Sequence, residues 1–186
     1  EPAELGAPQK VTADGTKIFR PDTGRLTPPS TEAPTVIASD FLLERGLVVT
    51  DGELSATTHV SGNVTHVKMT QTIDGLRVHG AYAKVAVADT GEVLQVIERL
   101  ALSDGAVAPA EITERAALTT AMLSLGFTEA PGEATPRDRV TTAFAPTSEL
   151  YRAPTVERVA YIEADGSVSA GFVVETWSGD NNQLDY

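Results

Sequence analysis

The histidines are the residues of this chain with the most obvious capacity for chemistry. His59, His66 and His79 are its three imidazoles, and none belongs to a His-Glu-x-x-His helix, in which two histidines bind zinc and the glutamate acts as a base. His59 and His66 could meet across neighbouring strands as metal ligands. No carboxylate stands in register with them, however, so the spacing favours solvated strand histidines. The chain has no cysteine, which excludes thiol catalysis, disulfides and a zinc-bound thiolate.

Other catalytic patterns are missing from the sequence as well. No serine lies in a Gly-x-Ser-x-Gly turn, and no glycine-rich phosphate loop precedes a helix. Asp180, Asn181 and Asn182 could ligate calcium, but Leu184 stands where such a loop needs the next oxygen, so a polar turn is favoured. The sequence therefore predicts a chain that catalyses nothing and holds no metal or cofactor of its own.

The charge balance narrows the choice of partner. Lys and Arg total 14 against 26 Asp and Glu, a formal charge of −12. Nucleic acids and anionic membrane surfaces select for clustered Lys and Arg, and no apolar run approaches the ~20 residues that span a bilayer. We therefore expect neither a nucleic-acid nor a membrane partner. The acidity itself is explained either by solubility or by a charge-complementary protein partner.

The first third of the chain predicts a leader followed by a helix. Residues 1–32 are rich in Pro, Gly and Thr, and predict a leader that is extended along a surface or disordered. Pro34 suits the first turn of a helix, because its missing N–H would be unpaired there. Gly46 is a natural C-terminal cap. Between them an apolar stripe is formed by Ile37, Ala38, Phe41 and Leu42.

The middle of the chain predicts an antiparallel meander. Residues 64–73 alternate between apolar and polar, which places Gln71 on the same face as Val67 and Met69. A buried amide must find partners, so we expect Gln71 to bond to the meander backbone and to fix the strand register. Asp74-Gly75 predicts a two-residue hairpin turn. Short strands are predicted at 76–78, 82–88 and 93–102, with a turn at residues 89–91.

The same pattern then repeats with a different sequence. Residues 111–125 predict a second helix that ends at Gly126, with Phe127 packing back on Met122. A polar loop is expected at 128–139, and strands at 140–145, 156–164 and 168–176. The predicted class is α+β: two helix-on-antiparallel-meander modules preceded by an extended leader. The expected domains are a leader at 1–32, a first module at 33–108 and a second at 109–186.

Residues 62–78 carry a resemblance to a known family. Thr65-His66-Val67, then Gln71, then Gly75 and a short apolar strand resemble the propeptide of fungalysin-type zinc metallopeptidases. The strand at 81–87, the turn from Asp89 to Gly91 and the strand at 93–96 continue the likeness. The last third, at 159–162 and 172–175, is similar to the PepSY module that follows in such propeptides.

The resemblance implies a role that the chain's own chemistry does not reveal. It implies a secreted, extracellular, non-catalytic pro-region, which assists folding of its peptidase and inhibits it until proteolytic removal. The implied partner is the catalytic domain of its own zinc metallopeptidase, and zinc is expected only in that domain. A free-standing secreted protease inhibitor or protein-binding module of the same fold remains the alternative.

The end of the chain is the candidate partner-binding segment. Large apolar groups stand there among small and acidic ones, a composition typical of interface anchors. If a pro-region leads its C-terminal end toward the enzyme, this segment is the part best placed to reach the cleft. The alternative is that the tryptophan closes the second sheet and the rest frays. The candidates are Trp177, Asp180, Leu184, Asp185 and Tyr186.

Overall fold

The computed structural model describes residues 8–21, 24–50, 53–102, 106–177 and 184–185. The chain divides into two compact units, one formed by Glu1–Ala106 with Ile162–Val168 and the other by Val107–Tyr161 with Ser169–Tyr186. Each unit has its own sheet and its own helix, in agreement with the predicted α+β class. The domain boundaries at residues 32 and 108 stay a prediction.

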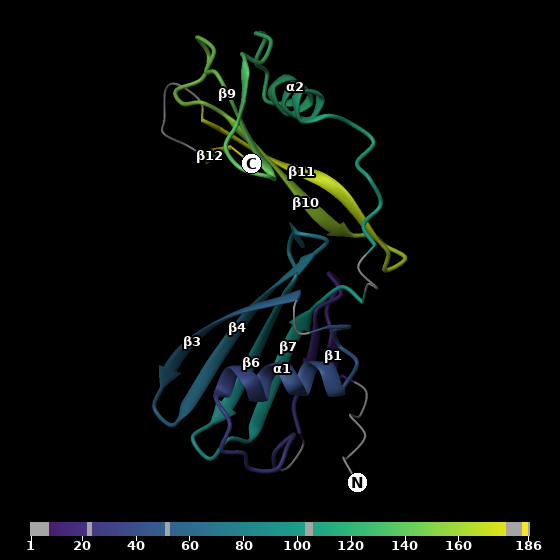
Figure 1. Ribbon diagram of the computed structural model, residues 1–186, viewed down its shortest axis with the longest axis vertical. Coiled ribbons are helices and arrows are strands. Elements are labelled where there is room, and N and C mark those ends of the chain that lie inside the picture. The colour runs from purple at the N-terminus through teal and green to yellow at the C-terminus, as the bar shows by residue number, and fades with distance from the viewer. Residues whose placement is uncertain (1–7, 22–23, 51–52, 103–105, 178–183, 186) are drawn as a thin grey trace. The chain divides into compact units, whose positions relative to one another are not determined.

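Strands dominate the order of elements along the chain (Figure 1). The first unit contains β1 (Lys10–Val11), β2 (Lys17–Phe19), α1 (Pro34–Glu44), β3 (Leu54–Ser61), β4 (Val64–Ile73), β5 (Leu76–Arg77), β6 (Tyr82–Ala88) and β7 (Val93–Arg99). Then follow α2 (Glu114–Ser124), β8 (Ala134–Pro136), β9 (Thr141–Phe144), β10 (Thr155–Ile162), β11 (Val168–Trp177) and β12 (Leu184–Asp185).

The first sheet is seven-stranded, with the order β1-β2-β7-β6-β4-β3 and β5 paired to β4. All its pairings are antiparallel, and α1 crosses one face of it (Figure 1). The core lies between the helix and that face. Its members are the buried side chains of the α1 stripe and of alternate strand positions, namely Phe19, Ile37, Ala38, Phe41, Leu42, Val48, Val67, Met69, Ala83, Val85, Val87, Val93, Val96 and Leu100.

The first helix begins and ends where its sequence predicts. Pro34 occupies the first turn, and the four buried residues of α1 are those of the predicted stripe. At the C-terminus Gly46 has φ +63° and donates its N–H to Leu43 O at 2.9 Å. Leu47 N–H donates to Leu42 O, also at 2.9 Å. Together these bonds form a Schellman motif, which satisfies helix carbonyls that would otherwise be unpaired.

Part of the predicted leader is an integral part of the first sheet. β2 pairs with β7, and the Phe19 ring is buried in the core. The Lys17 ammonium lies 3.1 Å from a carboxylate oxygen of Glu98, whose side chain is fully buried. A leader that is merely extended along a surface or disordered is therefore the wrong description of residues 17–19, because these residues close the core and neutralise a buried charge.

The second unit packs α2 on a five-stranded antiparallel sheet of order β12-β11-β10-β9-β8. The Thr113 hydroxyl accepts the N–H of Ala116, so the helix begins at Glu114 rather than at the predicted residue 111. Phe127 N–H donates to Met122 O at 3.0 Å, which confirms the predicted cap. The core contains Leu118, Met122, Phe144, Leu150 and Val156, with Phe127 packed against it.

The predicted loop at 128–139 contains the short strand β8 and is tied to the rest of the unit by carboxylates. Glu149 accepts the N–H of Glu129 at 2.8 Å and the N–H of Thr128 at 2.9 Å. Glu129 in turn accepts the N–H of Ser148 at 3.0 Å. The hydrogen bond from the Glu129 N–H, and to a smaller extent that from the Thr128 N–H, holds the pKa of Glu149 below its usual range. The two segments therefore clamp each other.

The Glu149 clamp predicts a pH-dependent contribution to the stability of the second unit. The pKa of Glu149 is depressed in the folded chain, so its contribution is full above the unfolded value of about 4.3 and is lost as pH falls through the folded value. Glu149→Gln should therefore lower the melting temperature at about pH 7, and the gap to the unmodified chain should be smaller at about pH 3. Fluorescence of Trp177, the chain's one tryptophan, reports on this unit. A gap of equal size at both pH values would contradict the assignment.

Candidate functional site

The buried Gln71 is the centre of the polar structure in the first unit. Its side chain is fully buried, as the alternation of β4 predicted. Its amide oxygen accepts the N–H of Ala101 at 2.8 Å, and its amide nitrogen donates to the carbonyl oxygen of Ala101 at 2.9 Å. The amide nitrogen also lies 3.2 Å from a carboxylate oxygen of Glu53. Gln71 thus pairs like a backbone unit and holds the chain after β7 against the centre of the sheet.

Two buried carboxylates complete this polar structure. Glu53 lies next to Gln71, and Glu98 accepts the N–H of Leu100 at 2.8 Å in addition to its contact with Lys17. Sequence reasoning missed both. The available signal for Glu98 was its alternation with Val96 and Leu100, which places all three on the inner face of β7. Glu98 holds the backbone of Leu100 and the leader residue Lys17, and Glu53 accepts from the Gln71 amide.

The two glycine turns of the motif differ in their surroundings. Asp74 and Gly75 have φ +51° and +73°, which is the conformation that a two-residue hairpin turn requires. Gly91 has φ +84° and is buried, and a methyl group there would overlap the backbone of Ser30. Asp89 donates its N–H to Asn63 O at 2.9 Å. The turn at 89–91 therefore packs against residues 26–30, which lead into α1. This contact is called the Gly91 seat below.

The Thr65-His66-Val67 triplet divides between the two faces of the first sheet. Val67 is buried in the core, whereas His66 is exposed on the face opposite α1. His59 and His66 are directly opposite each other on β3 and β4, and both are exposed. Within the described part of the chain no three His, Asp or Glu side chains are grouped as a metal site would need. The exposure of both side chains agrees with the solvated strand histidines that the sequence favoured.

Three of the five candidate partner-binding residues lie on described strands: Trp177 on β11, and Leu184 and Asp185 on β12. The Trp177 ring is partly buried; its indole N–H donates to Glu175 at 3.2 Å, and the Arg152 guanidinium lies 4.6 Å from the ring centroid. The backbone of Leu184 pairs with Trp177, and that of Asp185 with Thr176. Asp180 and Tyr186 lie outside the described residues. The role of all five residues in binding stays a prediction.

A comparison with protein families places the Gln71 contacts and the two glycine turns in one known sequence motif. Residues 48–100 match the family described as Fungalysin/Thermolysin Propeptide Motif. The match covers 53 of the chain's 186 residues. The motif runs from the buried Val48 to the buried Leu100 and includes β3 to β7, the hairpin turn, the Gly91 seat and Gln71. α1 and the leader strands lie outside the matched residues, although they complete the same core. No curated protein matches the chain.

The propeptide motif indicates the broad class of the region that it covers. It is the pro-region motif of fungalysin-type metallopeptidases, which are secreted, and it implies a non-catalytic region that associates with the catalytic domain of its own protease. Neither helix in the described ranges has the length and apolar character of a membrane span. The resemblance seen at residues 62–78 is therefore confirmed.

Proposed function

We propose that this chain is the pro-region of a secreted zinc metallopeptidase precursor, where it acts as intramolecular chaperone and inhibitor until proteolysis removes it. The observation that carries the proposal is the propeptide motif at residues 48–100, whose strands β3 to β7 are held together around the buried Gln71. The PepSY-like identity of the second unit belongs to the same proposal.

The packing of the first unit supports the proposed chaperone role. The unit has a core of its own, and its buried Gln71 amide bonds to the backbone of Ala101. A pro-region synthesised before its enzyme folds first, because domains fold as units from the N-terminal side during synthesis. A preformed sheet surface then lowers the entropic cost of ordering the catalytic domain that docks on it.

The inhibitory role is assigned to the segment 177–186. Trp177, Leu184 and Tyr186 are the proposed apolar anchors, and Asp180 and Asp185 are the nearest carboxylates for contact with the enzyme's zinc, because the chain offers no thiolate. The pairing of β12 with β11 places the backbone of Leu184 opposite that of Trp177.

Truncation after Ser178 tests this assignment. Removing Leu184 and Tyr186 should weaken inhibition of the precursor's own catalytic domain at least about tenfold, since anchors of this kind contribute about 2 kcal/mol or more each. The measurement is the inhibition constant of the purified chain against the separately purified catalytic domain.

A point variant controls for the lost backbone pairing. Leu184→Ala with Tyr186→Ala keeps the full length and should reproduce most of the loss. If truncation leaves the inhibition constant unchanged, the inhibitory surface lies on the sheets instead.

A further inference from the structure

The face of the first sheet that α1 does not cover is unusually cationic. Strand register places directly opposed residues on the same face of a sheet. One outward row crosses six strands and reads Lys10, Ile18, Ile97, Lys84, Lys68, Thr57. The adjacent row reads Gln95, Ala86, His66, His59. No residue in either row is acidic, although the whole chain carries a formal charge of −12.

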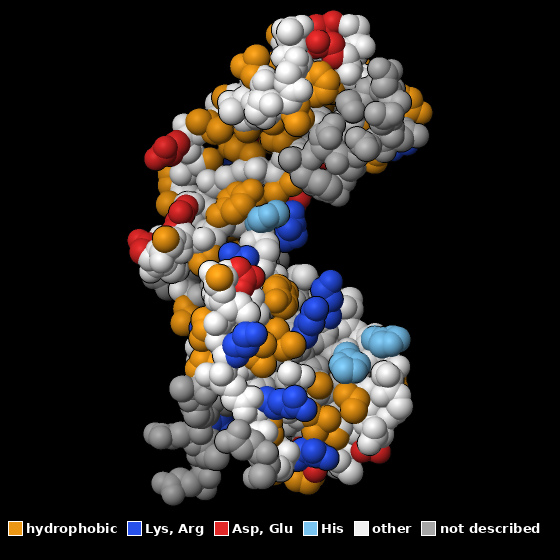
Figure 2. Space-filling model, turned by 180° about the vertical axis from the view of Figure 1, so that it is seen from behind, with side chains coloured by type: hydrophobic (Ala, Val, Ile, Leu, Met, Phe, Trp, Pro, Cys, Tyr) orange, Lys and Arg blue, Asp and Glu red, His pale blue; other side chains and the backbone are white. Residues whose placement is uncertain are grey.

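The two rows and Arg20, which lies beside Gln95, are called the cationic face below. Figure 2 shows this side of the molecule, with Lys, Arg and His side chains gathered over the strands of the first unit. The buried carboxylate of β7, Glu98, does not compensate them. It lies on the opposite face and contacts Lys17.

The arrangement of the lysines is unfavourable for the isolated sheet. Lys68 and Lys84 are directly opposed on β4 and β6, and both are exposed. Like charges at opposed positions destabilise a strand pair. The contact of the Lys84 ammonium with the Tyr82 ring, at 5.5 Å from the centroid, offsets this only in part. An opposed lysine pair in so acidic a chain is accounted for if a negative surface covers it.

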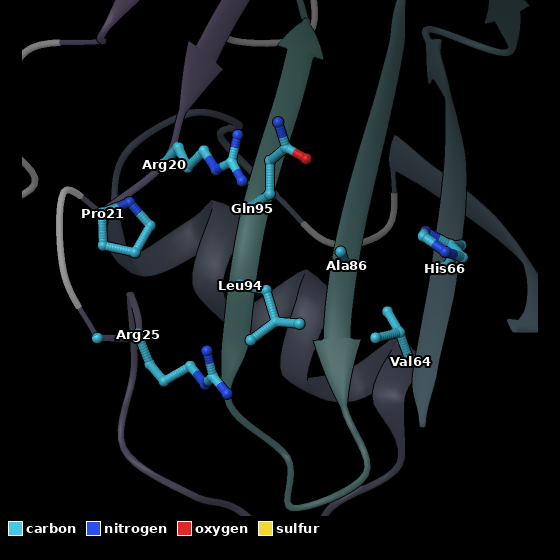
Figure 3. A pocket seen from close by; sticks show the side chains of 9 residues that line it. Arg20, Pro21, Arg25, Val64, His66, Ala86, Leu94 and Gln95 are labelled. Carbon is cyan, nitrogen blue, oxygen red and sulfur yellow. The ribbon is translucent and has the colours of Figure 1, made fainter. Parts of the chain in front are cut away.

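The cationic face is also hollowed at one end. A hollow of about 410 Å³ lies over β7, β6 and β4, with Leu94 and Ala86 in its floor (Figure 3). Arg20 and Arg25 extend from one side, and His66 lies at the other. Arg25 acts on Glu92, whose pKa is lowered first by the Thr90 hydroxyl and to a smaller extent by Arg25.

The width and composition of the face suit a protein interface. Its longer row crosses six strands that lie about 4.8 Å apart, so the row is about 24 Å long. The apolar Ile18 and Ile97 lie between the lysines, which suits a folded protein surface better than a polyanion.

We propose that the cationic face docks an acidic surface of the catalytic domain. The inference rests on the proposed function and adds the chemistry of the partner surface to it. The chain is negative overall, so it repels an extended polyanion at long range. An acidic patch confined to one side of a folded domain can instead contact the cationic face alone. Electrostatic attraction of this kind mainly raises the association rate, and salt screens it.

A double charge reversal tests the inference. Lys68→Glu with Lys84→Glu should slow association of the full chain with its precursor's catalytic domain at least about tenfold at about 50 mM salt, and the difference should shrink at about 500 mM. The matched control is Arg139→Glu with Arg158→Glu. It changes the net charge equally at two exposed positions of the second unit, and should change the association rate less than about twofold.

Each outcome decides for or against the face. If the reversal unfolds the first unit, Lys68→Gln with Lys84→Gln replaces it, with a smaller reduction expected in the same direction. Association that the reversal leaves unchanged, while the unmodified chain still inhibits, overturns this inference alone. The inference is also overturned if the double reversal leaves inhibition unchanged but abolishes binding to heparin, binding to anionic vesicles or self-association. The face would then bind a polyanion, a membrane or a second copy of the chain instead. A chain that inhibits nothing overturns the proposed function and this inference with it.

Discussion

Gln71→Leu should lower the free energy of unfolding of the first unit by about 3 kcal/mol. Leucine fits the volume but offers no hydrogen-bonding atom, so the N–H and the carbonyl of Ala101 both lose their partner in a buried site. Each unpaired buried group costs about 1–3 kcal/mol. Glu53 loses a donor as well.

The measurement must report on the right unit. Trp177 belongs to the second unit, so its fluorescence does not follow the unfolding of the first. Amide hydrogen exchange of β4 and β6 does, because these strands form the centre of the first sheet. Thr70→Leu is the matched control, since it places leucine at the neighbouring exposed position and should change stability by less than about 0.5 kcal/mol. Equal protection in the Gln71 variant and the control would refute the role given to the amide.

Gly91→Ala should destabilise the first unit by about 3 kcal/mol. Its left-handed backbone, with φ +84°, costs an alanine about 1 kcal/mol. The added methyl group would also overlap the backbone of Ser30, and relief of such overpacking costs about 1–3 kcal/mol more. The segment at 26–30 would have to leave its seat, where Leu26 N–H donates to Val93 O at 2.8 Å.

Gly75→Ala separates the two contributions. Its φ is +73°, but nothing lies near the position of an added methyl group. We expect it to lose only the conformational part, about 1 kcal/mol. The free energy of unfolding of the first unit is measured for both variants by chemical denaturation, with hydrogen exchange as the readout. Losses of equal size would mean that the seat at Gly91 yields freely to the added methyl group.

Local patterns in the sequence were sufficient to predict much of the fold. The α1 stripe, its Gly46 cap and the alternation of β4 each depend on residues close in the chain, and each was found in the structure. Burial of Gln71 followed from the same alternation. Its partner could not be predicted, because Ala101 lies 30 residues away and contributes only backbone atoms.

Features that depend on distant contacts were missed. Residues 17–19 carry no periodicity of their own, so only the pairing with β7 makes them a strand. The sequence predicted no bounds for β3, because its side chains are mostly exposed and show no alternation. Backbone pairing to β4 holds this strand in the sheet. The cationic face was hidden for a related reason: its charges come from strands far apart in the sequence, and the total charge of −12 conceals them.

The propeptide role was predicted from a motif rather than from reactive groups. Gln71, Gly75 and Gly91 have structural surroundings that explain their residue types without any catalysis. The spacing of these residues could therefore indicate the propeptide motif. Contact with the enzyme stays a proposal, and it concerns other residues, namely the cationic face and the segment 177–186.

Inhibition of the catalytic domain by this chain in trans is the most direct test of the account. The catalytic domain of the same precursor is titrated with the purified chain, and residual peptidase activity is measured. We predict stoichiometric inhibition with an inhibition constant below about 1 μM, which corresponds to about 8 kcal/mol of binding free energy. Full activity at a large molar excess of the folded chain would contradict the central claim.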